Sequence, residues 1–418
     1  MKEKNFKLTR IACFTAYIAA ASAFALPPLL FVTFREMYGI SYTLLGTLVL
    51  VNFCTQFSID MIFTMFTKYF NIKLAVRIMP LLTSAGLVIY ALSPTLFKGH
   101  EFAGLAIGTF VFSIAAGLGE VLISPIVAAI PSENPDRDMS LLHSIYAWGV
   151  LFVIVLSTGY FAVFGNENWV YLTLFFALLP IINSIFFFLS PIPDMSFGEN
   201  AKGERGKNRK IGFALCFVCI FLGSAAENVM TNWISGYMER AINIPKAYGD
   251  IFGMAVFALL LGLGRTLYAK FGKNIMKVLL WGMAGSAVCY ITAGASSNVI
   301  LAFGACILTG FATSLLWPGT LILMEEKIPN PGVAAYALMA AGGDFGASIA
   351  PQLMGYVVDA VTASELADKL SVTMNVTPEQ IGMKAGMLVT SVFPIIGVVV
   401  LVIMIKYFSG SSSDKRKA

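Results

Sequence analysis

Hydrophobic residues along the chain form twelve runs, each long enough to cross a membrane as an α-helix. A hydrocarbon core about 30 Å thick requires about 20 apolar residues in helical form. Lipid offers no hydrogen-bond partners to the backbone, which favours helices, and the alternating pattern of a membrane β-barrel is absent. We therefore predict an all-α integral membrane protein whose twelve transmembrane helices cover residues 11–34, 44–67, 73–93, 103–130, 140–164, 167–190, 211–236, 246–270, 275–295, 298–325, 331–360 and 384–408.

One polar segment divides these runs into two groups of six. The fourth and tenth runs correspond to each other, since each contains an internal proline, Pro125 or Pro318, and each ends in an Ile-Pro pair followed by an Asn-Pro pair, at 130–135 and 328–331. Two groups of equal number and the same orientation are typical of an internal parallel repeat. The sequence thus predicts an N-terminal six-helix bundle over 1–190, a cytoplasmic linker over 191–210 and a C-terminal six-helix bundle over 211–418.

Charged residues are scarce and unevenly distributed between the two sides of the predicted membrane. Mean hydropathy is +0.80, and 12% of residues are charged, against about 25% in soluble domains. If the first helix starts inside the cell, 22 of the 28 Lys and Arg residues lie inside. This bias predicts the cytoplasmic membrane and cytoplasmic N- and C-termini. The six outside are Arg35, Lys98, Arg240, Lys246, Lys369 and Lys384. The basic pI of about 8.8 is then explained by the basic residues on the inner side of the membrane, and we expect no nucleic-acid partner.

A glycine-rich and basic segment lies at the end of the eighth run. Gly262–Arg265 and Lys270–Lys273 resemble the loop motif of the major facilitator superfamily, although Ala269 stands where that motif usually has Asp. Glycines in such a segment allow close helix contact, and cations near helix ends meet lipid phosphates. The resemblance implies the major facilitator fold, in which two pseudo-symmetric bundles enclose a central cavity near the membrane midplane.

The fourth and fifth runs carry a second resemblance. Glu120 lies five residues before Pro125, and His143 and Tyr146 lie three residues apart just before Gly149. This pattern is similar to the fucose–proton symporter (sugar permease) family, which has Gln and Asn at the positions of His143 and Tyr146. The resemblance implies a proton-coupling role for Glu120 and solute contacts for His143 and Tyr146.

Asp60, Glu120 and Asp344 are carboxylates within the second, fourth and eleventh predicted helices. An ionisable side chain inside a membrane helix costs about 2.5–3.5 kcal/mol on insertion scales, so it usually faces a cavity and marks a substrate or proton path. We predict that these three are the proton-coupling candidates. The alternatives are a protonated Glu120 that bonds a neighbouring helix and an Asp344 that pairs with a cation.

Polar and aromatic side chains in three predicted helices are the candidates for solute binding. The seventh helix contributes two adjoining polar stripes with i, i+4 spacing, more than ordinary interhelical hydrogen bonding requires. Packing is the alternative for a buried His and for the Trp beside Pro318. The predicted substrate-binding residues are His143, Tyr146, Glu227, Asn228, Asn232 and Trp317.

No phosphate-binding loop, catalytic triad or metal-ligand spacing is evident, so we expect neither an enzyme nor a cofactor or bound metal. The pattern and the resemblance together favour a secondary active transporter that moves a small polar solute, a sugar by resemblance, by proton-coupled alternating access. The alternatives are a proton-coupled exporter of drugs or metabolites and a membrane solute sensor that transports nothing. The expected partners are a small-molecule substrate, protons and membrane lipids, with the chain acting as a monomer.

Overall fold

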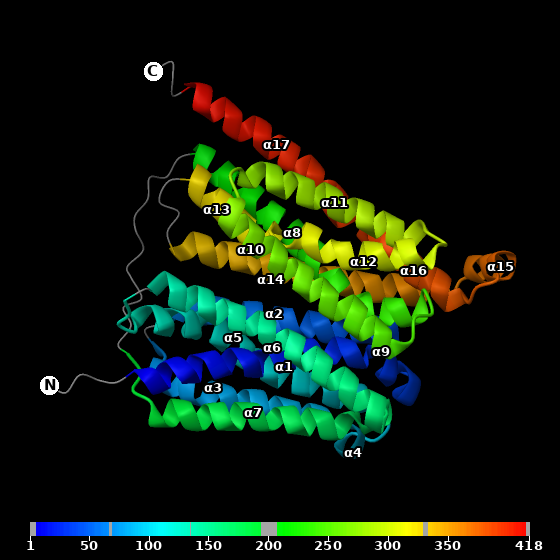
Figure 1. Ribbon diagram of the computed structural model, residues 1–418, viewed down its shortest axis with the longest axis horizontal. Helices are drawn as coiled ribbons and strands as arrows, with labels where there is room; N and C mark the ends of the chain where they lie inside the picture. Colours follow the sequence, from blue (N-terminus) through cyan, green and yellow to red (C-terminus); the bar gives the residue numbers. More distant parts are fainter. Residues whose placement is uncertain (1–5, 67–68, 134, 194–206, 329–332, 415–418) are drawn as a thin grey trace. The chain divides into compact units, whose positions relative to one another are not determined.

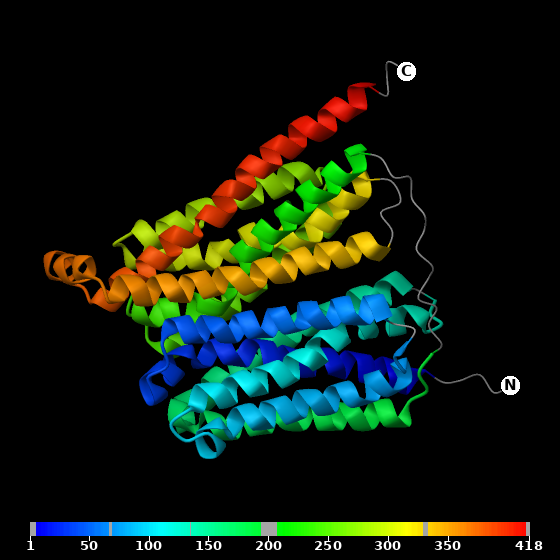
Figure 2. The same ribbon diagram turned by 180° about the vertical axis from the view of Figure 1, so that it is seen from behind.

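The computed structural model describes residues 6–66, 69–133, 135–193, 207–328 and 333–414, in which helices are the only regular secondary structure (Figures 1 and 2). The long helices are α1 (Lys7–Tyr38), α2 (Tyr42–Phe66), α3 (Ile72–Ala91), α5 (Glu101–Ala129), α6 (Pro135–Phe164), α7 (Trp169–Leu189), α8 (Lys207–Arg240), α10 (Val256–Phe271), α11 (Ile275–Ala295), α12 (Val299–Thr313), α13 (Leu316–Lys327), α14 (Val333–Thr362), α16 (Pro378–Thr390) and α17 (Val392–Asp414). Shorter elements are α4 (Ser93–Leu96), a 3-10 turn at Asn166–Asn168, α9 (Lys246–Tyr248), a π-helix at Gly249–Ala255 and α15 (Glu365–Met374).

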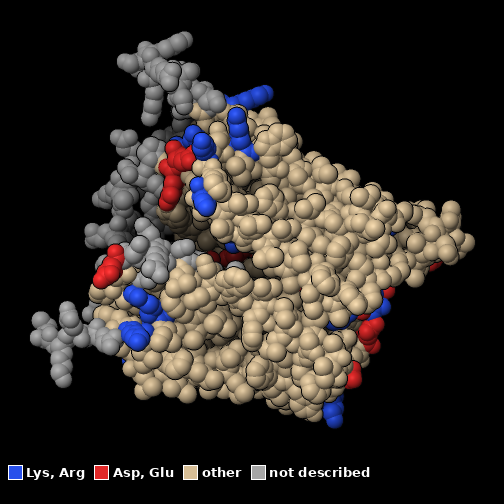
Figure 3. Space-filling model, viewed as in Figure 1, with Lys and Arg blue, Asp and Glu red and all other residues tan. Residues whose placement is uncertain are grey.

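Eleven segments in the described part of the chain are long and apolar enough to cross a membrane. Some combine two helices: α12 and α13 form the single segment Val299–Lys327, and α16 and α17 form Pro378–Phe408. The predicted run that is not among these segments is the eleventh, 331–360, which corresponds to α14; that helix is 30 residues long but rich in Gly and polar residues. The predicted all-α membrane fold is therefore confirmed. On the face drawn in Figure 3, charged side chains gather toward the ends of the long helices and most of the surface is uncharged.

The helices form two compact units. One comprises Met1–Ile40 and Val51–Gly198, and the other comprises Ser41–Leu50 and Glu199–Ala418. The beginning of α2 thus belongs to the second unit, a detail that the predicted boundary at 191–210 does not include.

In the first unit, α3 packs against α5 and α7, and α1 packs against α6 and α7. Glycines make the α3–α5 contact close: a Cβ at Gly108 would lie 2.6 Å from the Tyr90 nitrogen and 2.8 Å from the Gly86 oxygen. Close backbone approach at small residues is a common way for membrane helices to associate. This packing fixes α5, the helix that carries Glu120.

In the second unit, α14 packs against α8 and α16, while α12 packs against α10 and α11. Gly346 lets α14 approach α8, because a Cβ there would lie 2.1 Å from the Phe221 oxygen. The transmembrane segment of α12 and α13 is interrupted at Ser314 and Leu315, in the turn before Pro318. These contacts position the polar residues of α8.

Candidate functional site

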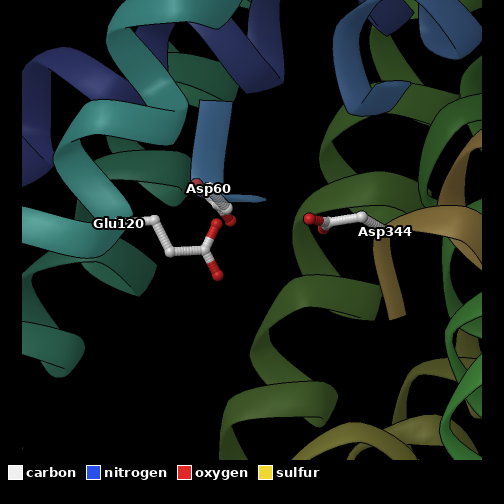
Figure 4. Close-up of side chains that lie close together, drawn as sticks. All are labelled: Asp60, Glu120 and Asp344. Carbon is white, nitrogen blue, oxygen red and sulfur yellow. The ribbon is translucent and has the colours of Figure 1, made fainter. Parts of the chain in front are cut away.

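The first unit brings two of the predicted carboxylates together. Asp60 on α2 and Glu120 on α5 have carboxylate oxygens within 4.8 Å of each other (Figure 4). Asp60 is half-buried and its Oδ1 has no hydrogen-bond partner among the described residues, whereas the Glu120 side chain is exposed. A carboxyl pair at this distance can hold a proton and pass it to water through its exposed member.

Hydrogen-bonded polar side chains lie on α2 and α5 in the turns before Asp60 and Glu120. The Ser113 hydroxyl donates to Asn52 Oδ1 at 2.6 Å, and Gln56 Nε2 donates to the same oxygen at 3.0 Å. One turn further along α5, a Cβ at Gly117 would lie 3.1 Å from the Gln56 oxygen, so the two helices are close here. The i, i+4 spacing of Asn52, Gln56 and Asp60 places them on one face of α2. That face meets α5, which accounts for the proximity of Asp60 to Glu120.

The predicted solute-binding residues of the fifth run lie on α6. Tyr146 is half-buried, and its ring lies edge-on to Tyr17 and Phe24 of α1, with centroid distances of 6.1 and 6.4 Å. The Tyr17 hydroxyl is 3.3 Å from Ser124 Oγ on α5, one turn after Glu120. The side chain of His143 lies outside the described residues.

The polar stripes of α8 are present in the second unit, and several of their groups bond their own helix. Asn228 Nδ2 donates to the Ser224 oxygen at 3.1 Å, and Asn232 Nδ2 donates to the Asn228 oxygen at 2.9 Å. The Thr231 hydroxyl donates to the Glu227 oxygen at 2.9 Å. Both Asn side chains make these bonds through Nδ2 and do not use their amide oxygens in them.

Glu227 pairs with a cation from another helix. Nη2 of Arg265, on α10, lies 3.3 Å from Glu227 Oε1, and Arg265 Nε donates to the Ser314 oxygen at 2.9 Å. The sequence patterns predicted Glu227 but assigned Arg265 to the loop motif at the inner membrane surface. A charged residue before the end of the apolar run 246–270 was the signal that would have identified it.

Asp344 and Trp317 lie at neighbouring positions in the second unit. Asp344 is buried on α14 and 2% exposed. The Trp317 ring on α13 lies against the adjacent residue Gly343, where a Cβ would be 2.2 Å from the ring. This contact accounts for the glycine and gives Trp317 a packing role on α14.

The donor set of the first unit is suited to a proton more than to a metal ion. Asp60 and Glu120 supply carboxylate oxygens only, whereas protein sites for Zn²⁺ or Ca²⁺ use about four or more ligands. The pair lies in membrane-length helices, where a shared proton lowers the cost of two charges.

A family model places the chain among known proteins. The model of the Major Facilitator Superfamily matches residues 12–351. The chain therefore belongs to the Major Facilitator Superfamily and is a multi-pass membrane transporter. No curated protein sequence is significantly similar to it.

Solved transporters share the fold along nearly the whole chain. A bacterial homologue of the human lysosomal transporter Spinster has a TM-score of 0.72 at 14% identity, covering 96% of this chain and 97% of that chain. The D-xylose–proton symporter has a TM-score of 0.72 at 12% identity, with 93% and 96% covered. The nucleoside transporter NupG has a TM-score of 0.71 at 14% identity, with 96% and 98% covered. At these identities the likeness concerns the fold alone.

Proposed function

We propose that the chain is a secondary active transporter that moves a small polar solute, a sugar, across the cytoplasmic membrane by proton-coupled alternating access. Both termini are cytoplasmic in this proposal, as the unequal distribution of basic residues favours: without Arg265, which lies within a candidate span, 21 of the remaining 27 fall on the inner side. Asp60 and Glu120 carry the proton, with Asp344 as the further candidate.

The Asp60–Glu120 pair is the observation that carries this proposal. Two negative charges no more than 4.8 Å apart repel each other by at least about 3 kcal/mol at an effective dielectric constant near 20. One proton shared by the pair removes this repulsion. Since Glu120 is exposed and Asp60 Oδ1 is not, Glu120 is the member that exchanges the proton with water.

The uncharged hydrogen-bonding groups of the candidate site favour a polar solute as the substrate in this proposal. Asn228 and Asn232 present amide oxygens on one stripe of α8, and such groups accept hydrogen bonds from hydroxyls. In the first unit, Tyr146 offers an aromatic ring and a hydroxyl of the kind that contacts sugars. The D-xylose–proton symporter has the same fold, so this architecture is compatible with sugar–proton symport.

Uptake by proteoliposomes tests the proposal. The purified chain is reconstituted, and uptake of a panel of neutral radiolabelled sugars is measured with and without an imposed inward proton gradient. We expect saturable uptake of at least one sugar and its concentration above the external level only when the gradient is present. Uptake of none, with proton-driven efflux of lipophilic cations, would instead favour an exporter.

A further inference from the structure

Arg265 places a positive charge within the membrane-spanning part of the second unit. Its side chain is 44% exposed and reaches Glu227, which lies near the middle of the candidate span Lys210–Arg240. Ser314, its second partner, lies near the middle of the span Val299–Lys327. The guanidinium is therefore held between three candidate membrane spans and bonds residues near the middle of two of them.

Pro318 leaves the backbone oxygen of Ser314 available to this guanidinium. In a regular helix the Ser314 oxygen would accept a hydrogen bond from the amide four residues later, but that residue is Pro318, which has no N–H. Arg265 Nε occupies the vacant acceptor at 2.9 Å. Gly264 permits the approach, because a Cβ there would lie 2.2 Å from Ser314 Oγ.

The ion pair with Glu227 leaves hydrogen-bonding capacity on both partners. An arginine and a carboxylate that bind each other fully form two parallel bonds of about 2.7–2.9 Å. Here the contact is a single one of 3.3 Å, and Glu227 Oε2 is buried with no hydrogen-bond partner among the described residues. Nη donors of Arg265 therefore remain available on its exposed side.

We propose that Arg265 binds an anionic group, a carboxylate or a phosphate, on the transported solute. The planar guanidinium matches the two oxygens of either group, and its anchored Nε orients the fork. The bound anion replaces Glu227 as the ion-pair partner of Arg265. The Glu227 oxygens then accept hydrogen bonds from the solute's hydroxyls. This inference rests on the proposed function and narrows its substrate class from sugars in general to acidic or phosphorylated sugars.

Ligand-dependent thermal stability of the purified full chain tests this inference. The unfolding midpoint is measured in phosphatidylcholine nanodiscs during titration with glucose, glucuronate or glucose 6-phosphate, which share a ring and differ in charge. We expect at least one of the two anions to stabilise the protein at concentrations at least tenfold lower than glucose. The better of the two identifies the anionic group.

Two variants test whether the Arg265–Glu227 ion pair determines the preference for an anion over glucose. Arg265→Lys keeps the charge but loses the planar fork, and it should reduce the preference for the anion at least tenfold. Glu227→Gln removes the competing carboxylate and should strengthen anion binding severalfold. Lys277→Ala, at an exposed cation on α11, is the control and should leave the preference unchanged.

Three outcomes would overturn the inference. The first is the absence of any preference for an anion over glucose in the unaltered protein. The second is a preference that Arg265→Lys and Glu227→Gln both leave intact. The third is Arg265-dependent stabilisation by phosphatidylglycerol in the nanodisc and by neither soluble anion, which would make a lipid headgroup the ligand.

The same measurements separate this inference from the proposed function. Proton-driven uptake of neutral sugars that does not depend on Arg265 would leave the transporter proposal intact and refute the anion site. Arg265-dependent anion binding without solute accumulation in proteoliposomes would do the reverse.

Discussion

The carboxylate of Asp359 caps the helix that begins at Tyr42. Its two oxygens accept hydrogen bonds from the backbone amides of Tyr42 and Thr43, at 3.1 and 2.6 Å. The hydroxyl of Tyr42 donates to Glu379 Oε1 at 2.6 Å, and its ring lies 5.6 Å from that of Trp233. The fully buried Tyr42 thus fixes the start of α2 to α14, α16 and α8, which explains why Ser41–Leu50 belongs to the second unit.

Asp359→Asn should destabilise the protein. A carboxylate at a helix N-terminus satisfies free amides and interacts favourably with the helix dipole, and the amide replaces one acceptor oxygen with a donor that faces an N–H. We expect the free energy of unfolding to fall by about 1–2 kcal/mol, measured by thermal or denaturant unfolding of the purified protein. Glu326→Gln, at an exposed position in the last turn of α13, is the control because it removes a carboxylate that is not at a helix N-terminus. Equal stability of the two variants would show that the cap contributes nothing.

Gly108→Ala should be destabilising through overpacking. The new Cβ would lie 2.6 Å from the Tyr90 nitrogen and 2.8 Å from the Gly86 oxygen, and neither backbone atom can move without displacing α3. Overpacking of this kind typically costs about 1–3 kcal/mol. Gly159→Ala on α6 is the control, because no atom beyond the adjacent residues and the nearby backbone of its own helix lies within 4 Å of its Cβ position. A melting temperature of Gly108→Ala at or above that of the control would contradict the predicted clash.

The sequence predicted the helices well because a long apolar run in lipid must satisfy its own backbone hydrogen bonds, and an α-helix does so. It did not predict the π-helix at Gly249–Ala255, which holds the buried Asp250 3.2 Å from Lys246 Nζ. An extra residue in one helical turn leaves the hydrophobic pattern almost unchanged. A π-helix of this kind therefore cannot be predicted from a run of apolar residues and is seen in the structure alone.

Periodicity also predicted which residues share a face, but it does not predict which helix that face meets. Asp60 and Glu120 were each recognised as costly carboxylates in a membrane, and their proximity depends on the α2–α5 contact at Gly117. Glu227 was recognised on α8, whereas its partner Arg265 is 38 positions away. Pairings between helices are tertiary information, and they decide the chemistry of both clusters.

The orientation of the chain can be measured by labelling single cysteines. Labels at Ala201, which lies outside the described residues, and at Ser411 should react only from the cell interior, as the positive-inside bias predicts. A label in the loop of α15 should react from outside. Val372 is better suited there than Ser364, because Val372 is 84% exposed while Ser364 caps α15 through the Ala367 amide. External labelling at Ala201 would reverse the proposed orientation.

Glu120→Gln should uncouple solute movement from the proton gradient. The amide is close in size to a protonated carboxyl and removes the charge repulsion with Asp60, but it cannot release a proton. We expect proton-driven accumulation to fall to the level reached without a gradient, while exchange of solute between loaded pools continues. Both are measured in proteoliposomes with the sugar that the unaltered protein transports.

Matched variants identify the carrier among the carboxylates. Asp60→Asn should impair coupling in the same way if the two residues share one proton, and Asp344→Asn tests the remaining candidate. Glu101→Gln is the control on the same helix, since Glu101 is the half-buried first residue of α5, far along the helix from Glu120, and accepts a hydrogen bond from the Gly99 amide at 2.8 Å. If Glu120→Gln still concentrates solute when a pH gradient is the only driving force, the proton is carried elsewhere. Loss of accumulation in Asp344→Asn alone would transfer that role from the first unit to α14.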